Sequence, residues 1–296
     1  MTRNLSLRSL LEAAGVEPWT VDEVVSRALS EDLGARGDVT TTATVPPSLM
    51  SSADLVSRAA GIVAGLPVAA SVFDSVGEGR VRVEFGTVDG AAVTTGEVLA
   101  TVYGPVRDLL AAERTALNLL GHLSGVATLT RTWVDAVAGT GVQIRDTRKT
   151  LPGLRALQKY AVRCGGGVNH RMSLSDAALV KDNHVAAAGG IVNAFDRVRT
   201  HHPDLMLEIE VDTVEQAYEV IDAGAELVLL DNMPPHQMRQ VVAYAAGRCE
   251  LEASGGLTLQ TAREVAATGV NYLAVGALTH SASVLDIGMD LRMGRG

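Results

Sequence analysis

Residues 145–171, RDTRKTLPGLRALQKYAVRCGGGVNHR, concentrate positive charge in a chain whose formal net charge is −9. The cationic side chains of this stretch are Arg145, Arg148, Lys149, Arg155, Lys159, Arg163, His170 and Arg171. Only one acidic residue, Asp146, accompanies them. Arginine forks bind carboxylates and phosphates in bidentate geometry. The stretch is therefore either a solvated basic face or part of a site for a ligand with several negative charges.

The elements that must position these residues follow a regular pattern. The sequence predicts strands over 204–212, 225–232, 248–254 and 271–277, with helices over 214–224, 235–247 and 259–269. Two earlier strands are predicted within 141–149 and 178–184. Strand starts recur about every 22 residues, which is typical of βα units in a parallel sheet or barrel. We therefore expect an open α/β barrel of about six parallel strands.

Polar residues and glycines stand where each of these strands should end. Because sites in such folds lie at the carboxyl ends of the strands, we interpret the strand ends together as one site. The glycines of SGGL (254–257) and VGAL (275–278) would let backbone amides approach a phosphate. The residues at the strand ends are Arg148, Lys149, Lys181, Glu210, Asp231, Ser254, Gly255, Gly256, Gly276 and Ala277.

Glu210 and Asp231 stand at neighbouring strand ends, and three roles are open for this pair. They could be a general acid/base pair, ligands for Mg²⁺, or acceptors for sugar hydroxyls. With two carboxylates and a phosphate cradle facing the cations, the pocket fits a phosphorylated sugar together with a small di- or tricarboxylate.

The middle of the basic stretch has a different interpretation. Arg155, Lys159 and Arg163 fall at helical spacing, and we expect them on the exposed face of a helix. Cys164 is interpreted as a small packing residue beside the 165–167 glycine turn, not as a nucleophile, because no base partner stands near it. That turn would deliver His170 and Arg171 into the pocket.

The remaining features of the sequence limit which class of protein this can be. Residues 80–104 predict an antiparallel sheet and residues 106–139 a long helix. The acidic total argues against a nucleic-acid partner, and no apolar run is long enough to span a membrane. Two cysteines are too few for a disulfide framework. We expect a soluble protein of the cytoplasm.

Residues 145–171, followed by LSDAALVKDNH (174–184), resemble the signature of the quinolinate phosphoribosyltransferase family. The resemblance extends over EDLGARGDVTT (31–41), ERTALNLLGHLSGVAT (113–128) and the later strand ends LEIEVDT, LLDNM, EASGGL and YLAVGALTHS. It implies an N-terminal α/β sandwich domain over residues 1–125, joined by residues 278–296. It also implies an open-faced α/β barrel over residues 126–277, the type II phosphoribosyltransferase architecture.

The resemblance also implies a reaction. Quinolinate and phosphoribosyl pyrophosphate would give nicotinate mononucleotide, pyrophosphate and CO₂ in NAD biosynthesis, with Mg²⁺ as cofactor. The enzyme would be a homodimer in which Arg114 reaches the site of the partner subunit, and assembly into hexamers stays open. The implied substrate-binding residues are Arg114, Thr147, Arg148, Lys149, His170, Arg171, Lys181, Glu210, Asp231, Ser254, Gly255, Gly256, Val275, Gly276, Ala277 and His280.

Within this set the resemblance distributes the roles. Arg148, His170 and Arg171 would hold the quinolinate carboxylates. The 5′-phosphate would be held by Ser254, Gly255, Gly256, Gly276, Ala277 and His280. Lys149, Lys181, Glu210 and Asp231 would be catalytic, and the two acids would hold Mg²⁺ directly or through water.

Three alternatives are weighed against this function. A molybdenum-transport-associated relative shares the fold, but the set of Arg114, Arg148, His170 and Arg171 argues against it. An aldolase-like barrel could use Lys149 or Lys181 as a Schiff-base nucleophile. A non-catalytic anion-binding protein would not need two carboxylates opposite the cations.

Overall fold

A computed structural model describes residues 7–292 of the chain, which divide into two compact units. Within the described range, the first unit comprises residues 7–131, 150–166 and 279–292. The second comprises Thr132–Lys149 and Gly167–Leu278. No helix within the described range is both long enough and apolar enough to cross a lipid bilayer.

The first unit contains a four-stranded antiparallel sheet with the strand order β12-β1-β5-β3. Its strands are β1 (Met50–Ser57), β3 (Arg82–Phe85), β5 (Val98–Pro105) and β12 (Ile287–Arg292). The antiparallel pairing predicted within 80–104 is confirmed by β3 and β5, whereas β4 (Ala92–Val93) pairs with β2 (Gly61–Ile62). The helices before the long helix are α1 (Leu7–Ala13), α2 (Pro18–Leu33), α3 (Val39–Thr44) and α4 (Leu66–Gly77).

The predicted long helix is present as α5 (Val106–Ala136). It is followed in the first unit by α6 (Arg155–Cys164), which lies in the middle of the basic stretch. The expected boundaries put residues 150–166 into the barrel, but their side chains make contacts within the first unit. The Tyr160 hydroxyl donates to Asp89 Oδ2 at 2.5 Å, and Gln158 Nε2 lies 2.9 Å from His122 Nε2.

The prediction that Lys159 lies on an exposed helix face is wrong. Its side chain is fully buried, as are its neighbours Leu157, Gln158 and Val162. Arg155 is half-buried, and of the three cations only Arg163 is exposed. Helical spacing identified a helix here, but the first unit covers α6 on most sides, so the spacing does not mark a solvated face.

The second unit is built on a six-stranded parallel sheet with the order β6-β11-β10-β9-β8-β7. The strands are β6 (Gln143–Arg145), β7 (Ala178–Val180), β8 (Leu207–Val211), β9 (Leu227–Asp231), β10 (Glu250–Ser254) and β11 (Tyr272–Ala274). Strands β6 and β7 form the two ends of this order, so the sheet does not close by pairing them. The predicted open barrel of six parallel strands is therefore confirmed.

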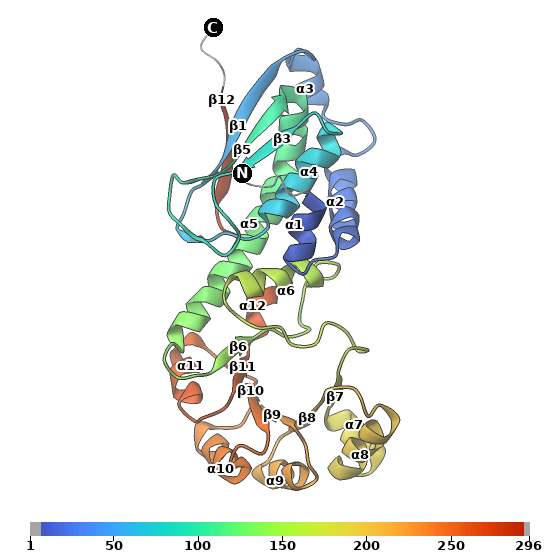
Figure 1. Cartoon of the computed structure of the whole chain (residues 1–296), viewed down its shortest axis with the longest axis vertical. Helices are drawn as coiled ribbons and strands as arrows, with labels where there is room; N and C mark the ends of the chain where they lie inside the picture. Colours follow the sequence, from blue (N-terminus) through green and yellow to red (C-terminus); the bar gives the residue numbers. More distant parts are fainter. Residues whose placement is uncertain (1–6, 293–296) are drawn as a thin grey trace. The chain divides into compact units, whose positions relative to one another are not determined.

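Helices follow the barrel strands and lie outside the arc of strands (Figure 1). They are α7 (Asp182–Ala188), α8 (Ile191–His201), α9 (Val214–Asp222), α10 (Pro235–Ala245) and α11 (Leu259–Ala266), and the short helix α12 (Ala277–His280) follows β11. Thr213 and Thr258 start α9 and α11 by accepting the backbone N–H groups of Gln216 and Thr261. Pro235 in the first turn of α10 suits a position that needs no N–H donor.

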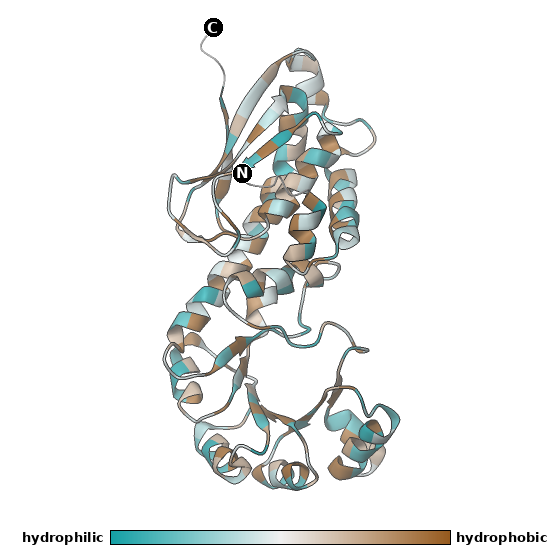
Figure 2. Cartoon of the chain, in the orientation of Figure 1, coloured by the Kyte–Doolittle hydropathy of each residue, from teal (hydrophilic) through white to brown (hydrophobic). Residues whose placement is uncertain are grey.

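Alternation along the strands separates the helix-facing core from the barrel interior. Ile209, Val211, Val228 and Leu230 are buried and hydrophobic, and such positions mark the strands of the sheet in Figure 2. Burying one side chain of this size contributes about 1.5–3 kcal/mol. The opposite face of β8 carries Glu208 and Glu210, so the inner side of the sheet is the one with charged groups.

Candidate active site

A cavity of about 570 Å³ lies at the carboxyl ends of the parallel strands in the second unit. Most of the residues that the sequence assigned to one site line it. These are Thr147, Arg148, Lys149, His170, Arg171, Lys181, Glu210, Asp231, Ser254, Gly255 and Gly256. Leu179, Leu229, Asn232, Glu252 and Ala274 complete the lining.

Parallel pairing brings these residues together. Asp231 at the end of β9 is in register with Ser254 at the end of β10, and Ala274 of β11 is in register with both Ser254 and Arg145. Groups that lie some 20 to 130 positions apart in the chain therefore share one edge of the sheet, as expected for βα folds.

The arginines of the cavity are poised to bind an anion. The Nε atoms of Arg148 and Arg171 are buried, and within residues 7–292 neither has a hydrogen-bond partner. Burial and the neighbouring Arg148 guanidinium lower the pKa of Arg171 from its ordinary value. The Arg171 Nη1 group donates to the carbonyl of Ala177 at 2.8 Å, which fixes the side chain. Two half-buried arginines whose buried Nε donors are unused are stabilised most by a bound carboxylate or phosphate.

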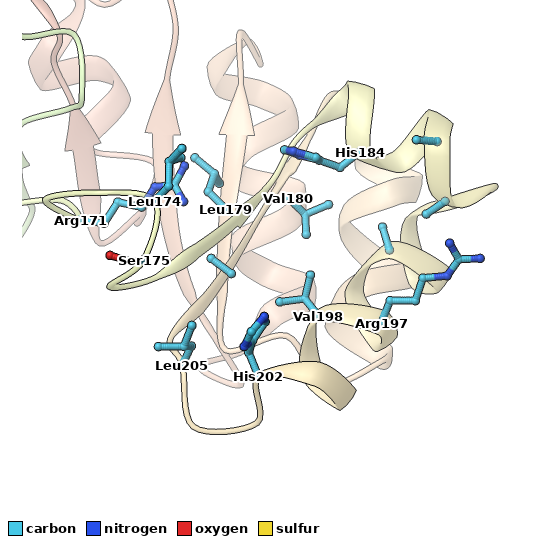
Figure 3. Close-up of a pocket in the computed structure, with 14 residues that line it drawn as sticks. Arg171, Leu174, Ser175, Leu179, Val180, His184, Arg197, Val198, His202 and Leu205 are labelled. Atoms are coloured by element: carbon cyan, nitrogen blue, oxygen red, sulfur yellow. The ribbon is translucent and has the colours of Figure 1, made fainter.

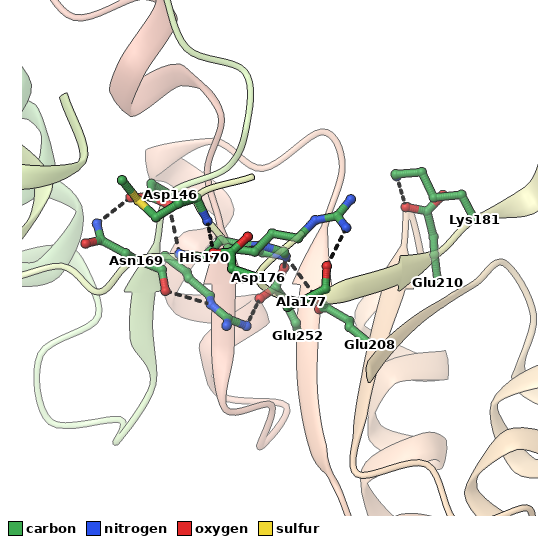
Figure 4. Close-up of polar contacts among 12 residues, drawn as sticks. Asp146, Asn169, His170, Asp176, Ala177, Lys181, Glu208, Glu210 and Glu252 are labelled. Atoms are coloured by element: carbon green, nitrogen blue, oxygen red, sulfur yellow. Dashed lines mark hydrogen bonds and ion pairs between the residues drawn. The ribbon is translucent and has the colours of Figure 1, made fainter. Parts of the chain in front are cut away.

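The acidic side of the cavity is already partly engaged. Glu210 pairs through Oε2 with the Lys181 ammonium group (Figure 4). Asp231 accepts a hydrogen bond at Oδ2 from Asn232 Nδ2 at 2.7 Å. Both acids are thereby held in place, and each keeps a second carboxylate oxygen. Carboxylate oxygens are the ligands that Mg²⁺ prefers, and Mg²⁺ retains several waters, so two such acids fit this ion.

A glycine turn follows β10 beside Asp231. Gly255 has φ +86° and Gly256 has φ +59°, both in the left-handed region that glycine tolerates best. A Cβ atom at Gly255 would lie 2.2 Å from Oδ1 of Asn232, so this turn and Asn232 are in close contact. Asn232 itself has φ +52°, and its backbone N–H donates to the carbonyl of Ser254 at 2.9 Å.

Some of the assigned residues are not among those that line the cavity. Val275, Gly276 and Ala277 follow β11 at the same edge, where the Val275 N–H donates to the Arg145 carbonyl at 2.9 Å. His280 belongs to the first unit and contacts Ser281 Oγ at 2.7 Å. Arg114 also belongs to the first unit, on α5, with 62% of its side chain exposed. The roles assigned to these residues stay predictions.

A buried polar network that sequence reasoning missed adjoins the cavity, and two of its members, His170 and Glu252, also line it. His170 Nε2 lies 2.7 Å from Glu208 Oε2, and Arg145 Nη1 lies 2.7 Å from Glu252 Oε2. Fully buried Asp146 accepts hydrogen bonds from the backbone N–H of His170 and from Asn169 Nδ2 (Figure 4). Burial and the neighbouring Glu208 raise the pKa of Glu252 to about 8.

A pattern in the sequence could have revealed the two buried acids. Glu208 stands two residues before Glu210 in β8, and Glu252 stands two residues before Ser254 in β10. Since alternate strand residues share a face, each of these acids points to the same side as a predicted site residue, one layer deeper. A glutamate inside an apolar strand with that spacing indicates a buried support for the site.

His170, Glu208 and Glu252 could in principle hold a metal ion, because one ligand atom of each lies within 4.8 Å of the others. The Arg145 guanidinium bonded to Glu252 already supplies a positive charge at this place. An ion would have to share the Glu252 carboxyl group with that arginine, so we interpret the cluster as an internal polar network.

Cys164 is not set up as a nucleophile. Burial raises the pKa of its thiol to about 11, so the thiol is protonated at neutral pH. It lies in the first unit, and the expected packing role agrees with this burial.

A second cavity, of about 640 Å³, lies beside the edge strand β7 (Figure 3). Its walls are mainly alanine, leucine and valine side chains of β7, α7 and α8, with Arg197 and His202 among the polar groups. Arg171 lines both cavities, but the second contains no carboxylate among its described lining residues. It therefore lacks the pairing of acids and cations that distinguishes the first.

Comparisons with known proteins bear on both units. The family model described as quinolinate phosphoribosyl transferase, C-terminal domain, matches residues 126–290, and the corresponding N-terminal domain model matches residues 38–124. A protein of Mycobacterium leprae named nicotinate-nucleotide pyrophosphorylase (carboxylating) is 53% identical over 273 residues, 91% of this chain and 96% of that protein.

Two further relatives are similar over most of their length. A probable nicotinate-nucleotide pyrophosphorylase (carboxylating) of Bacillus subtilis is 41% identical, over 89% of this chain and 90% of that protein. The crystal structure of NadC from Streptococcus pyogenes superposes with a TM-score of 0.90 at 38% identity, over 94% of this chain and 98% of that one.

Proposed function

The chain belongs to the quinolinate phosphoribosyltransferase family, and from this premise we propose how its site performs the reaction. The enzyme transfers a phosphoribosyl group to quinolinate with loss of one carboxyl group as CO₂, which gives nicotinate mononucleotide for NAD biosynthesis. The proposal concerns the donor, the roles of the residues, the metal ion and the assembly.

One observation carries the proposal for the acceptor side. Arg148 and Arg171 meet in one cavity with buried, unused Nε donors, and Lys149 lines the same cavity. Quinolinate is a pyridine with two adjacent carboxylates, so it carries two negative charges on one edge. Two guanidinium forks can each take one carboxylate and so balance both charges. A pyridine with a single carboxylate would leave one buried arginine without an anion.

The donor in this proposal is phosphoribosyl pyrophosphate. Ser254, Gly255 and Gly256 offer backbone N–H groups to its 5′-phosphate, together with residues 275–277 at the neighbouring strand end. Lys149 and Lys181 line the same cavity, where they would bind the pyrophosphate. Glu210 and Asp231 then face the ribose ring, with Lys181 and Asn232 fixing their orientation.

The chemistry follows from that arrangement. The lone pair of the pyridine nitrogen forms a bond to C1 of the ribose as the bond from C1 to the pyrophosphate oxygen breaks. Positive charge develops at C1, and the carboxylates of Glu210 and Asp231 stabilise it electrostatically. The ring nitrogen becomes cationic, so its charge stabilises the electron pair that stays on the adjacent ring carbon when the carboxylate leaves as CO₂, and that carbon then uses the pair to take up a proton. Positioning and charge neutralisation supply most of the acceleration.

Glu210 and Asp231 would also hold Mg²⁺, directly or through water. The ion would neutralise charge on the departing pyrophosphate. Lys181 shares Glu210 with that ion, and this limits how much of the carboxylate the ion can use.

The donor and the metal ion can be tested together. Nicotinate mononucleotide formation from quinolinate should require both phosphoribosyl pyrophosphate and Mg²⁺, should stop with EDTA, and should not occur with ribose 5-phosphate. Turnover that persists after EDTA treatment and exhaustive dialysis would contradict the proposed metal dependence. Trapping of the protein by borohydride in the presence of a carbonyl substrate would instead favour Schiff-base chemistry at Lys149 or Lys181.

We also propose a homodimer in which Arg114 completes the site of the partner subunit. Its side chain is 62% exposed, and it pairs only loosely with the adjacent Glu113, at 3.9 Å, so it is available for an intersubunit role. Arg114→Ala and Lys149→Ala should each be nearly inactive alone. Random mixing should restore about a quarter of the wild-type activity, because mixed dimers have one intact site. Absence of recovery in proven mixed dimers would place Arg114 outside the partner's site.

A further inference from the structure

The imidazole of His170 is engaged by protein groups at both ring nitrogens. The backbone N–H of Arg171 lies 2.7 Å from Nδ1, and the Oε2 atom of Glu208 lies 2.7 Å from Nε2. The ring is 8% exposed, and the Glu208 side chain is 3% exposed. These contacts therefore form in the wall of the substrate cavity and are shielded from bulk solvent.

The chemistry of the partners fixes the proton on this ring. A backbone N–H can only donate, so Nδ1 must be the unprotonated acceptor. The proton of a neutral imidazole then sits on Nε2, where it is donated to the Glu208 carboxylate. One ring thus links a buried acid to the backbone of Arg171, whose side chain lines the substrate cavity.

Glu252 cannot replace Glu208 in this link. Its nearest oxygen, Oε1, lies 3.8 Å from His170 Nε2, and its Oε2 atom is taken by Arg145 Nη1 at 2.7 Å. The second oxygen of Glu208 is buried and, among the described residues, has no hydrogen-bond partner. Burying a carboxylate that is only half satisfied is costly, which indicates that the remaining contact to His170 has a role.

We propose that Glu208 is a positioning residue for quinolinate binding: it holds His170 as the Nε2–H tautomer, and His170 in turn holds the backbone of Arg171 so that its guanidinium faces the substrate. This inference deepens the proposed function and rests on it, because it takes Arg171 as a ligand of a quinolinate carboxylate. In the sequence-based expectation His170 holds a carboxylate directly. Here its effect on the carboxylate passes through Arg171.

Kinetic variants test the role. Glu208→Leu should raise the KM for quinolinate at least tenfold, while the KM for phosphoribosyl pyrophosphate changes less than twofold. Glu208→Gln keeps an oxygen acceptor for Nε2–H and should stay within about threefold of the wild-type quinolinate KM. Glu226→Leu, an exposed acid just before β9, serves as the control and should leave both constants unchanged.

The results that would overturn the role are equally specific. An unchanged quinolinate KM in Glu208→Leu would do so, and so would equal increases in the KM of both substrates. Failure of Glu208→Gln to rescue the quinolinate KM would show that the charge of Glu208, not its hydrogen bond to His170, is what matters.

A spectroscopic test does not depend on any variant folding. In ¹⁵N-labelled wild-type protein, His170 should show a neutral ring with the proton on Nε2 at neutral pH. A protonated Nδ1, in either a neutral or a cationic ring, would refute the link to Arg171. This NMR result does not depend on turnover. A wild-type enzyme that rejected quinolinate would refute the proposed function, and the NMR spectrum would still decide which tautomer His170 adopts.

Discussion

Replacing Gly255 by alanine should damage the site in a way that the same change at Gly256 does not. Both residues have positive φ, at +86° and +59°, so both substitutions place a side chain in an unfavourable backbone conformation. The surroundings differ. A Cβ atom at Gly255 would lie 2.2 Å from Oδ1 and 2.5 Å from Cγ of Asn232, whereas at Gly256 the nearest atom of Asn232 is 3.9 Å away.

The magnitude follows from these two contributions. The left-handed backbone costs about 1–2 kcal/mol at either position. At Gly255 the Asn232 side chain must also move, and the hydrogen bond from its Nδ2 atom to Asp231 is lost. A hydrogen bond to a charged group is worth about 1.5–3 kcal/mol, and the loss should lie at the low end of this range because solvent can replace the donor at this exposed position. A loss of about 1.4 kcal/mol in the transition state lowers the rate about tenfold.

The assay is a double-substitution cycle on kcat/KM for phosphoribosyl pyrophosphate, with unfolding in urea as the measure of stability. Gly255→Ala should lower kcat/KM about tenfold more than Gly256→Ala, and it should also lose more stability, because the Asn232–Asp231 hydrogen bond belongs to the folded protein. Asn232→Gly removes the obstructing side chain and suits the positive φ of that position. In the Asn232→Gly background, Gly255→Ala should cost no more activity than Gly256→Ala. Equal effects of the two glycine substitutions in the wild-type background would refute the reasoning.

Three further predictions concern the buried charges and the thiol. Arg148→Lys and Arg171→Lys should each raise the KM for quinolinate by one to two orders of magnitude, because lysine cannot replace the bidentate fork; an unchanged KM in steady-state assays would contradict this. The raised pKa of Glu252, about 8 against an ordinary 4.5, means that the folded protein holds a proton there that the unfolded chain has released. The contribution of Glu252 to the free energy of unfolding should therefore fall as pH rises from about 4.5 to about 8. Urea unfolding of Glu252→Gln at several pH values should show no such fall from this position. Cys164→Ser should keep wild-type kcat, since the thiol with a pKa of about 11 is protonated at neutral pH; loss of turnover in a folded variant would show that the thiol takes part.

The strand ends could be predicted from the sequence because two simple rules meet there. Regular βα spacing gives the strands, and parallel pairing brings their carboxyl ends together, so the amino-acid order alone assigns Lys181, Glu210 and Asp231 to one cavity. The buried support beneath them was harder to recognise. Glu208 and Glu252 interrupt apolar strands, and without the register of the sheet each could be taken for an exposed charge.

Lys159 shows the opposite difficulty. Its spacing from Arg155 and Arg163 predicts a charged helix face, yet α6 is covered nearly all round and Lys159 is fully buried. What covers a helix depends on contacts that are distant in sequence, such as that of Tyr160 with Asp89. Periodicity within the helix cannot supply that information. The same long-range contacts set residues 150–166 apart from the barrel.

The most direct test of the central claim compares quinolinate with nicotinate, each with phosphoribosyl pyrophosphate and Mg²⁺, using quinolinate labelled in the carboxyl group next to the ring nitrogen. The paired arginines predict that quinolinate is converted with one labelled CO₂ per nicotinate mononucleotide, and that nicotinate is not a substrate. Efficient turnover of nicotinate, or release of labelled CO₂ without the nucleotide, would contradict the claim that Arg148 and Arg171 are built for two adjacent carboxylates.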